Sequence, residues 1–171
     1  MAIGEAFEPV LAAAQTGAEW GFGRLYAEYN PRLERYFAAR TPRMAEDLAA
    51  DTWLGAARAL REFQGDEGRF RSWLFTIAHR RLADHWEDLR RRPADPAGAG
   101  PEDDPVAADD TEGAVLDALS AQAAAARIAA ALSGDQAEVV LLRLLGDLDV
   151  DQVAEVLGKR PGTIRVLQHR A

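Results

Sequence analysis

The segment DVDQVAEVLGKRPGTIRVLQHRA, residues 149–171, predicts two short helices and the turn between them. Asp149 and Gln152 have the spacing of a capping box, which marks the start of a helix. Gly158 suits the left-handed C-cap of that helix, and Pro161 suits the first turn of a final helix that runs to residue 171. Two helices joined by so short a turn are typical of a helix-turn-helix unit.

The final helix has a basic outer face, because residues 159–171 contain four Lys and Arg and no acid. The apolar positions Val153, Leu157, Ile164 and Leu167 are spaced so that the two helices pack together. A helix of this kind can enter the major groove, where Arg, Gln and His side chains address base edges. The alternative is a solvated basic face on a packing helix that binds no DNA.

Helical periodicity also dominates the rest of the chain, so we expect an all-α fold. Apolar residues recur at three-to-four spacing, and no segment alternates as a half-buried strand would. Pro31 should kink the first long helix or shift its start. Besides the two helices above, we expect a helix along the apolar run from Phe22 to Phe37 and further helices at 44–63, 69–91, 115–132 and 135–145. Residues 64–68 are expected to form a loop.

Composition divides the chain into two small helical domains and a tether. Residues 93–113 are rich in Pro, Gly, Ala and acids and cannot bury enough apolar surface to fold, which predicts a flexible acidic linker. Residues 93–126 contain eight acids and no Lys or Arg, a surplus equal to the formal net charge of −8 for the whole chain. The low isoelectric point therefore describes this segment, and we expect a first module at 1–92 and a second module at 114–171.

The same composition excludes several classes of protein. The 171 residues include no Cys and three His, so disulfide scaffolds, thiol nucleophiles and Cys-ligated zinc are excluded. No His-Glu-x-x-His spacing is present, and we expect no metal and no cofactor. No apolar run reaches the ~18 residues of a membrane span, so we expect a cytoplasmic protein without membrane insertion.

Two helices of the first module contain candidate binding residues. Residues 69–92 combine seven Arg with aromatic side chains, the combination that unpaired bases and their backbone require, although a core role for those aromatics is the simpler interpretation. On the helix 44–63, Glu46, Asp47 and Asp51 form an acidic edge. That edge fits a basic partner helix, but acids are also favoured in a first helical turn for electrostatic reasons.

Three stretches in this order resemble the extracytoplasmic-function (ECF, group 4) sigma factors of bacterial RNA polymerase. MAEDLAADTWLGAARALREF (44–63) is similar to region 2.2 of that family, and FRSWLFTIAHRRLADHW (70–86) is similar to regions 2.3 and 2.4. Residues 132–171 are similar to region 4. One such motif is moderately specific, whereas three in the right order around a variable linker are highly specific.

The resemblance implies a promoter-specificity subunit, which is not an enzyme and has no catalytic residue. Its partners would be core RNA polymerase (β′ and β subunits), promoter DNA and an anti-sigma factor, and it would be associated with the bacterial nucleoid when bound to polymerase. The helix 44–63 would dock on the coiled coil of β′. The core-binding residues implied in this way are Asp47, Leu48, Asp51, Trp53 and Leu54.

The resemblance also assigns DNA contacts. Regions 2.3 and 2.4 would melt the −10 element and capture a base in a pocket formed by the preceding loop, at a cost of a few kcal/mol for unstacking. The residues implied in −10 binding are Gln64, Gly65, Arg69, Arg71, Trp73, His79, Arg80, Asp84 and His85. The residues implied in −35 binding are Lys159, Arg160, Thr163, Arg165, Val166, Gln168, His169 and Arg170.

The sequence departs from the family pattern in region 4. Arg160-Pro161 stands where relatives usually have Ser or a similar cap, and Val166-Leu167 replaces a usual polar pair, which predicts a distinct −35 preference. Residues 1–20 match nothing diagnostic. Two rival interpretations stay open at this point: a helix-turn-helix regulator that binds duplex DNA without polymerase, and an all-α metal enzyme with paired carboxylates.

Overall fold

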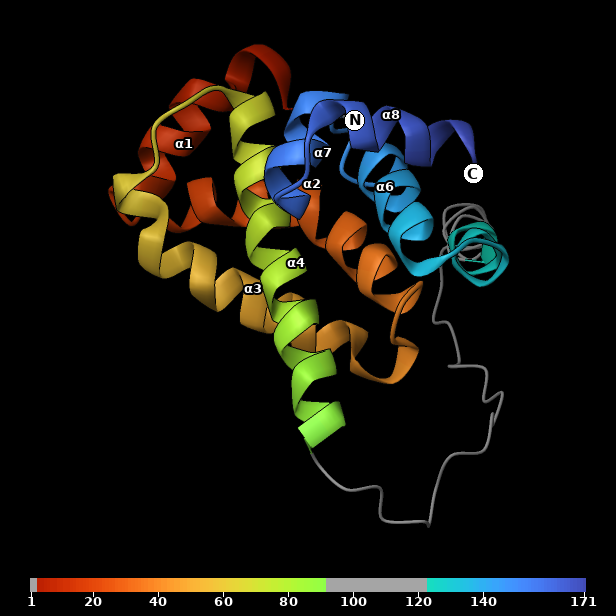
Figure 1. The fold of residues 1–171 in the computed structure, drawn as a ribbon. Coiled ribbons are helices and arrows are strands. Elements are labelled where there is room, and N and C mark those ends of the chain that lie inside the picture. Colours follow the sequence, from red (N-terminus) through yellow and green to blue (C-terminus); the bar gives the residue numbers. More distant parts are fainter. Residues whose placement is uncertain (1–2, 92–122) are drawn as a thin grey trace.

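The computed structural model describes residues 3–91 and 123–171, and within them the chain is helical with no strand (Figure 1). The all-α expectation is confirmed. In this part of the chain no helix is both long enough and apolar enough to span a membrane. The elements are η1 (Gly4–Ala6), α1 (Phe7–Gln15), α2 (Glu19–Ala38), η2 (Pro42–Met44), α3 (Ala45–Ala59), η3 (Leu60–Glu62), α4 (Glu67–Arg91), a helix over 123–131, α6 (Gly134–Leu144), α7 (Val150–Leu157) and α8 (Pro161–His169).

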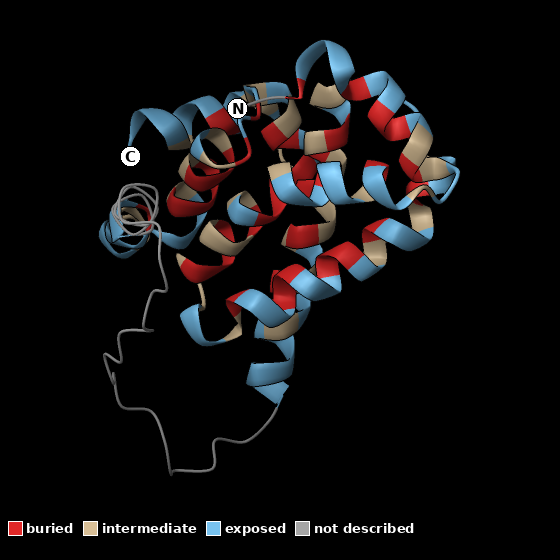
Figure 2. Ribbon diagram, turned by 180° about the vertical axis from the view of Figure 1, so that it is seen from behind, coloured by how far each residue is buried: buried red, intermediate tan, exposed pale blue. Residues whose placement is uncertain are grey.

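The first module is built around buried aromatic rings. Tyr36, Phe37, Phe70 and Phe75 are fully buried between α2, α3 and α4, and Figure 2 shows buried residues along the inner faces of these helices. Rings of this size remove the most apolar surface from water and interlock at their edges. They fix α4, which bears the predicted DNA-binding residues, against the rest of the module.

Helix α1 lies directly on α2, an arrangement that the first twenty residues did not predict. At Gly21 a Cβ atom would lie 2.5 Å from the Ala14 amide nitrogen and 2.8 Å from the Val10 carbonyl oxygen. The two backbones approach so closely that only glycine fits here. The packing of α1 therefore depends on one residue in the first turn of α2.

Two sequence expectations for the first module need correction. Of the two effects predicted for Pro31, a shifted helix start is wrong, because Pro31 lies inside α2, which begins at Glu19. The helix continues through it because packing compensates for one missing N–H. Helix α4 begins at Glu67, within the predicted loop 64–68. Asp66 explains the earlier start, since its Oδ1 accepts a hydrogen bond of 2.8 Å from the Arg69 amide, as an N-cap side chain does.

The helix-capping residues that the sequence predicts for α7 and α8 of the second module are confirmed. Asp149 caps α7 by accepting from the Gln152 amide at 2.8 Å, and Gln152 Oε1 accepts from the Asp149 amide at 2.9 Å. Gly158 has φ 61°, the left-handed conformation of a C-cap, and Pro161 is the first residue of α8. The predicted linker 93–113 and the predicted helical residues 115–122 lie outside the described residues.

Candidate polymerase and nucleic-acid interfaces

The acidic edge of α3 faces solvent. Asp47 and Asp51 are exposed one turn apart, and Leu54 beside them is 57% exposed. Together they form a surface with two carboxylates and one large apolar side chain. This composition suits a helix with basic and apolar residues.

Leu48 and Trp53, also predicted to bind polymerase, lie in the core. Each is 5% exposed, and the Trp53 Nε1 donates a hydrogen bond of 3.1 Å to Asn30 Oδ1 on α2. The correction has a simple physical reason: an amphipathic helix presents its acids to solvent and packs its large apolar side chains inward. In this structure these two residues pack in the core beneath the acidic edge.

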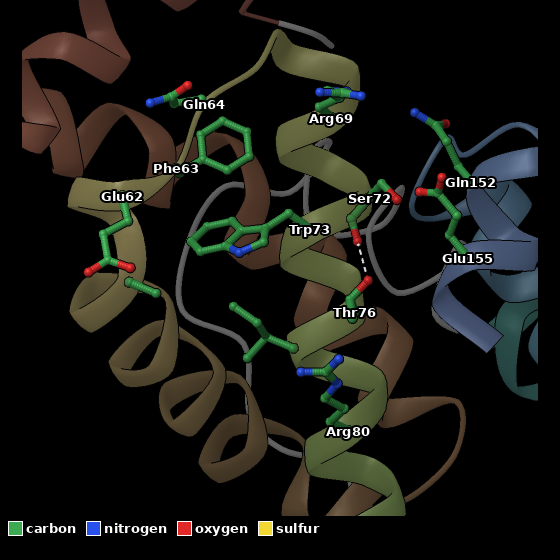
Figure 3. Close-up of a pocket in the computed structure, with 12 residues that line it drawn as sticks. Glu62, Phe63, Gln64, Arg69, Ser72, Trp73, Thr76, Arg80, Gln152 and Glu155 are labelled. Atoms are coloured by element: carbon green, nitrogen blue, oxygen red, sulfur yellow. Dashed lines mark hydrogen bonds between the residues drawn. The ribbon is translucent and has the colours of Figure 1, made fainter. Parts of the chain in front are cut away.

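A pocket of about 700 Å³ lies where α3, η3 and α4 meet, and Figure 3 shows the half-buried indole of Trp73 at its centre. The Trp73 ring centroid is 5.1 Å from that of Phe63 and 5.6 Å from that of Phe70. We call this cavity the Trp73 pocket. It is lined by Ala59, Glu62, Phe63, Gln64, Arg69, Ser72, Trp73, Thr76, Ile77, Arg80, Gln152 and Glu155.

The loop at the rim of the Trp73 pocket is tightly folded. Gly65 has φ 153°, and a Cβ atom there would lie 2.8 Å from the Arg69 Cβ. Glycine therefore lets the loop turn directly onto the first turn of α4. As a result Gln64 and Arg69 line the pocket from two different segments.

The structure brings together only part of the predicted −10 set. Gln64, Arg69, Trp73 and Arg80 line the Trp73 pocket, and Gly65 shapes its rim. The other four residues lie elsewhere on α4. Arg71 and His79 contact the second module, and Asp84 and His85 lie on later turns away from the pocket.

The helix α8 presents its polar residues to solvent. Ile164 is fully buried against the second module, as predicted, together with Val153 of α7. Lys159 is the exception among the predicted −35 residues, because it is half-buried and its Nζ lies 3.0 Å from Asp135 Oδ2. The exposed members of the set are Arg160, Thr163, Arg165, Val166, Gln168, His169 and Arg170.

Sequence reasoning missed a polar contact between the modules that is centred on Glu138 of α6. Its side chain accepts from the Tyr36 hydroxyl, its Oε1 lies 2.9 Å from His79 Nδ1, and its Oε2 lies 3.5 Å from Arg40 Nε. Burial, followed by the neighbouring Glu138 carboxylate, raises the pKa of Tyr36 well above its ordinary value. A lone acid within the apolar run AEVVLL was the available signal.

A second missed acid ties the start of the chain to α4. Glu67 accepts from the amides of Ile3 and Gly4 at 2.6 and 2.9 Å and from the Tyr29 hydroxyl at 2.5 Å. Burial alone would raise the pKa of Glu67, but these hydrogen bonds to the charged form outweigh it and lower the pKa. Burial, then the bond to Glu67, raises the pKa of Tyr29.

The pocket and the exposed helix lie in segments that match known families. The Sigma-70 region 2 family matches residues 25–92, and the Sigma-70 region 4 family matches residues 122–171. The chain belongs to the ECF sigma factors. Residues 25–92 are therefore a sigma region 2. Sigma factors are promoter-specificity subunits that bind DNA and are not enzymes, so both rival interpretations fall away.

Curated relatives of this sigma factor are found in streptomycetes. It is 38% identical to the ECF RNA polymerase sigma factor BldN of Streptomyces coelicolor over 164 residues, which cover 95% of this chain and 61% of BldN. It is 34% identical to the ECF RNA polymerase sigma factor ShbA of Streptomyces griseus, over 86% of this chain and 81% of ShbA. The fold is shared with CnrH in its complex with the cytosolic domain of CnrY, with a TM-score of 0.61 at 24% identity, over 98% of this chain and 92% of CnrH.

Proposed function

We propose that this chain binds core RNA polymerase and directs initiation at promoters by recognising a −10 element with the first module and a −35 element with the second. The observation that carries the proposal is the pairing of the Trp73 pocket, within the region 2 match, with the exposed basic helix α8, within the region 4 match. The protein then works with polymerase in the bacterial cytoplasm and is associated with the nucleoid when polymerase is bound to DNA.

The Trp73 pocket is the site we assign to an extruded −10 base. An indole offers a flat π-face for stacking, worth about 1–3 kcal/mol per base. The guanidinium groups of Arg69 and Arg80, above and below it on the same face of α4, are placed to hold the flanking phosphates. Arg71 and His79 join this set only after their contacts with the second module are released.

Helix α8 is the part that we assign to the −35 duplex. Its N-terminal turn starts at Pro161, and the exposed side chains of Arg165 and Gln168 lie one turn apart on it. An Arg that bonds a guanine edge contributes about 1–3 kcal/mol of discrimination. Lys159 has a lesser part in this assignment, because its ammonium group is paired with Asp135.

The acidic edge of α3 is the surface that we assign to the β′ coiled coil. In the test, the double variant Asp47→Arg, Asp51→Arg is compared with a matched charge-reversal variant, Glu5→Arg, Glu8→Arg, whose exposed acids lie outside α3. We expect the first to lose binding to core polymerase and the second to keep it, by gel filtration and by affinity measurement. Unchanged binding of the α3 variant would remove these residues from the interface.

An anti-sigma factor is the regulator that we propose for this chain. The solved complex of CnrH with the cytosolic domain of CnrY supports it by analogy.

The function itself is tested by transcription: core polymerase with this chain should start transcripts at a discrete set of genomic sites that core polymerase alone does not use. An identical set of starts with and without the chain would overturn the proposal.

A further inference from the structure

Residues 60–66, which join α3 to α4, form one wall of the Trp73 pocket, and we call them the pocket segment. Glu62, Phe63 and Gln64 of this segment line the pocket, and Figure 3 shows Phe63 beside the indole of Trp73. Carbonyl oxygens at the end of a helical turn have no acceptor role within that turn. The course of the pocket segment therefore depends on donors from elsewhere in the chain.

Gln15, the last residue of α1, supplies those donors. Its Nε2 donates to the Leu60 carbonyl at 3.0 Å and to the Phe63 carbonyl at 2.7 Å. An amide nitrogen has two hydrogens, so both are used on the pocket segment. The two acceptors are the first residue of η3 and the residue that follows it, and Gln15 therefore fixes the direction in which the chain leaves α3.

The other end of the pocket segment is attached to the residues just before α1. Glu67 directly follows the segment, and its carboxylate accepts from the Ile3 amide at 2.6 Å and from the Gly4 amide at 2.9 Å. Hydrogen bonds to a charged carboxylate are stronger than those between neutral groups. Residues 3–15 thus hold the pocket segment at both of its ends.

A row of aromatic rings connects α1 to the pocket as well. The ring centroid of Phe7 on α1 lies 5.6 Å from that of Phe70, which in turn lies 5.6 Å from those of Phe63 and Trp73. Phe7 and Phe70 are buried. Because ring contacts of this kind depend on the orientation of each ring, the position of α1 influences the two rings that form the pocket.

Residues 3–15 act on the pocket indirectly. They precede the residues matched by the Sigma-70 region 2 family, 25–92, and none of them is among the described residues that line the pocket. We infer that residues 3–15 form a clamp that positions the pocket segment for the capture of a base, with Gln15 as its positioning residue. The role in base capture rests on the proposed function, whereas the clamp itself is a property of the chain alone.

The clamp is tested by amide hydrogen exchange, followed by NMR in the full chain without DNA or polymerase. The Phe63 amide is the reporter, because it donates to the Leu60 carbonyl that Gln15 also bonds. Gln15→Ala should raise its exchange rate by about three- to tenfold. The matched control is Thr16→Ala, since the exposed Thr16 hydroxyl bonds only the Ala13 carbonyl of its own helix among the described residues; this variant should leave the rate unchanged.

A second amide separates a local effect from a general loss of stability. Phe37 is fully buried within α2, away from the pocket segment, and its exchange rate should not change in Gln15→Ala. An unchanged Phe63 rate, or an equal rise at Phe63 and Phe37, would overturn the clamp. Gln15→Glu keeps the length of the side chain but offers no donor to the two carbonyls, so it should raise the Phe63 rate too and provides the test where Gln15→Ala is unfolded.

The consequence for base capture is measured with the polymerase complex. The probes are −10 single strands in which one base at a time is replaced by an abasic site, and the replacement that costs the original chain the most affinity identifies the captured base. Gln15→Ala should reduce the preference for the intact over that abasic strand by about three- to tenfold, with unchanged affinity for the abasic strand. A simple loss of folded protein would weaken both strands equally.

The outcomes separate the clamp from the proposed function. An equal preference for the intact strand in the original chain and in Gln15→Ala would overturn the positioning role of Gln15. Equal affinities for every abasic strand and the intact strand in the original chain would instead count against base capture and so against the proposed function. In that case the exchange rates of Phe63 and Phe37 alone decide whether the clamp exists.

Discussion

The two surfaces that we assign to promoter DNA differ in their accessibility in the free chain. On α8 the polar side chains from Arg160 to Arg170 face solvent, whereas the Trp73 pocket is bordered by Gln152 and Glu155 of the same chain. Recognition of a duplex by α8 therefore needs no rearrangement. In the Trp73 pocket, by contrast, the indole is half-buried between two walls, and only Gln64, Arg69 and Arg80 of the predicted −10 residues that line it are exposed.

The difference has a physical rationale. A pocket that stacks and pairs with unpaired bases offers an aromatic face and cations to any single strand, so the partial burial of Trp73 limits unspecific binding. A helix that reads base edges is already selective through the pattern of donors and acceptors in the groove. The four predictions below test the two modules and their surfaces separately, in order of decreasing expected effect.

The largest effect is expected for Gly21→Ala, which disrupts the module that contains the Trp73 pocket. The new methyl group would lie 2.5 Å from a backbone nitrogen of α1, and overpacking against backbone costs about 3 kcal/mol or more. We expect a lower free energy of unfolding by chemical denaturation. The matched control is Gly23→Ala in the same helix, where a Cβ atom meets nothing within 4 Å. There alanine should raise the free energy of unfolding by about 0.5–1 kcal/mol. Equal effects of the two substitutions would contradict the close packing of α1 on α2.

Trp73→Ala should weaken binding of −10 single-stranded DNA by the polymerase complex by about 2 kcal/mol, or about thirtyfold. Binding of −35 duplex should not change. Trp86→Ala is the matched control, because Trp86 is a tryptophan of the same helix that lies outside the Trp73 pocket. Fluorescence anisotropy with each DNA measures both affinities, and an equal loss for the two variants would contradict the assignment of the pocket.

Helix ends and the buried faces of helices are the properties of this fold that follow from local sequence. The capping box of Asp149 and Gln152, Gly158 and Pro161 act on neighbouring residues, so local sequence predicted the ends of α7 and the start of α8. Leu48 and Trp53 were assigned to polymerase because they belong to a family motif, although their apolar periodicity already placed them on the inner face of α3.

The contacts that sequence could not predict join residues far apart in the chain. Glu138 and Tyr36 are 102 residues apart, and Glu67 is 64 residues from Ile3. Nothing local distinguishes a buried, paired acid from a solvated one before the helices are packed. For the same reason, the place of Gln152 and Glu155 in the lining of the Trp73 pocket follows only from the packing of α7 on α4.

Arg165→Ala should weaken −35 duplex binding by the polymerase complex by about 1.5 kcal/mol, or about tenfold. Affinity for core polymerase should stay the same, because Arg165 lies on the exposed face of α8, far along the chain from the acidic edge of α3. Arg127→Ala, an exposed arginine of the helix 123–131, is the matched control. A parallel loss of polymerase binding would contradict the division of labour between the modules.

Glu67→Gln should have the smallest effect, about 1 kcal/mol of unfolding free energy at neutral pH, because the amide cannot accept from both Ile3 and Gly4. Since the folded-state pKa of Glu67 is lowered, its contribution is complete above the ordinary value of 4.5 and is lost as pH falls through the lower folded-state pKa. The difference in stability between the two proteins should therefore shrink towards acid pH. A difference that grows on acidification would contradict the assigned hydrogen bonds.

The most direct test of the account is photo-crosslinking from two positions of the full chain in complex with core polymerase and a promoter found by the transcription experiment. A photoreactive phenylalanine at exposed position 64 should label only the non-template strand of the melted −10 element, and one at exposed position 168 should label only the upstream duplex. Without polymerase, position 64 should label no promoter DNA, since the −10 element is then not melted. Labelling of one and the same element from both positions, or no labelling from position 64 in the polymerase complex, would contradict the account.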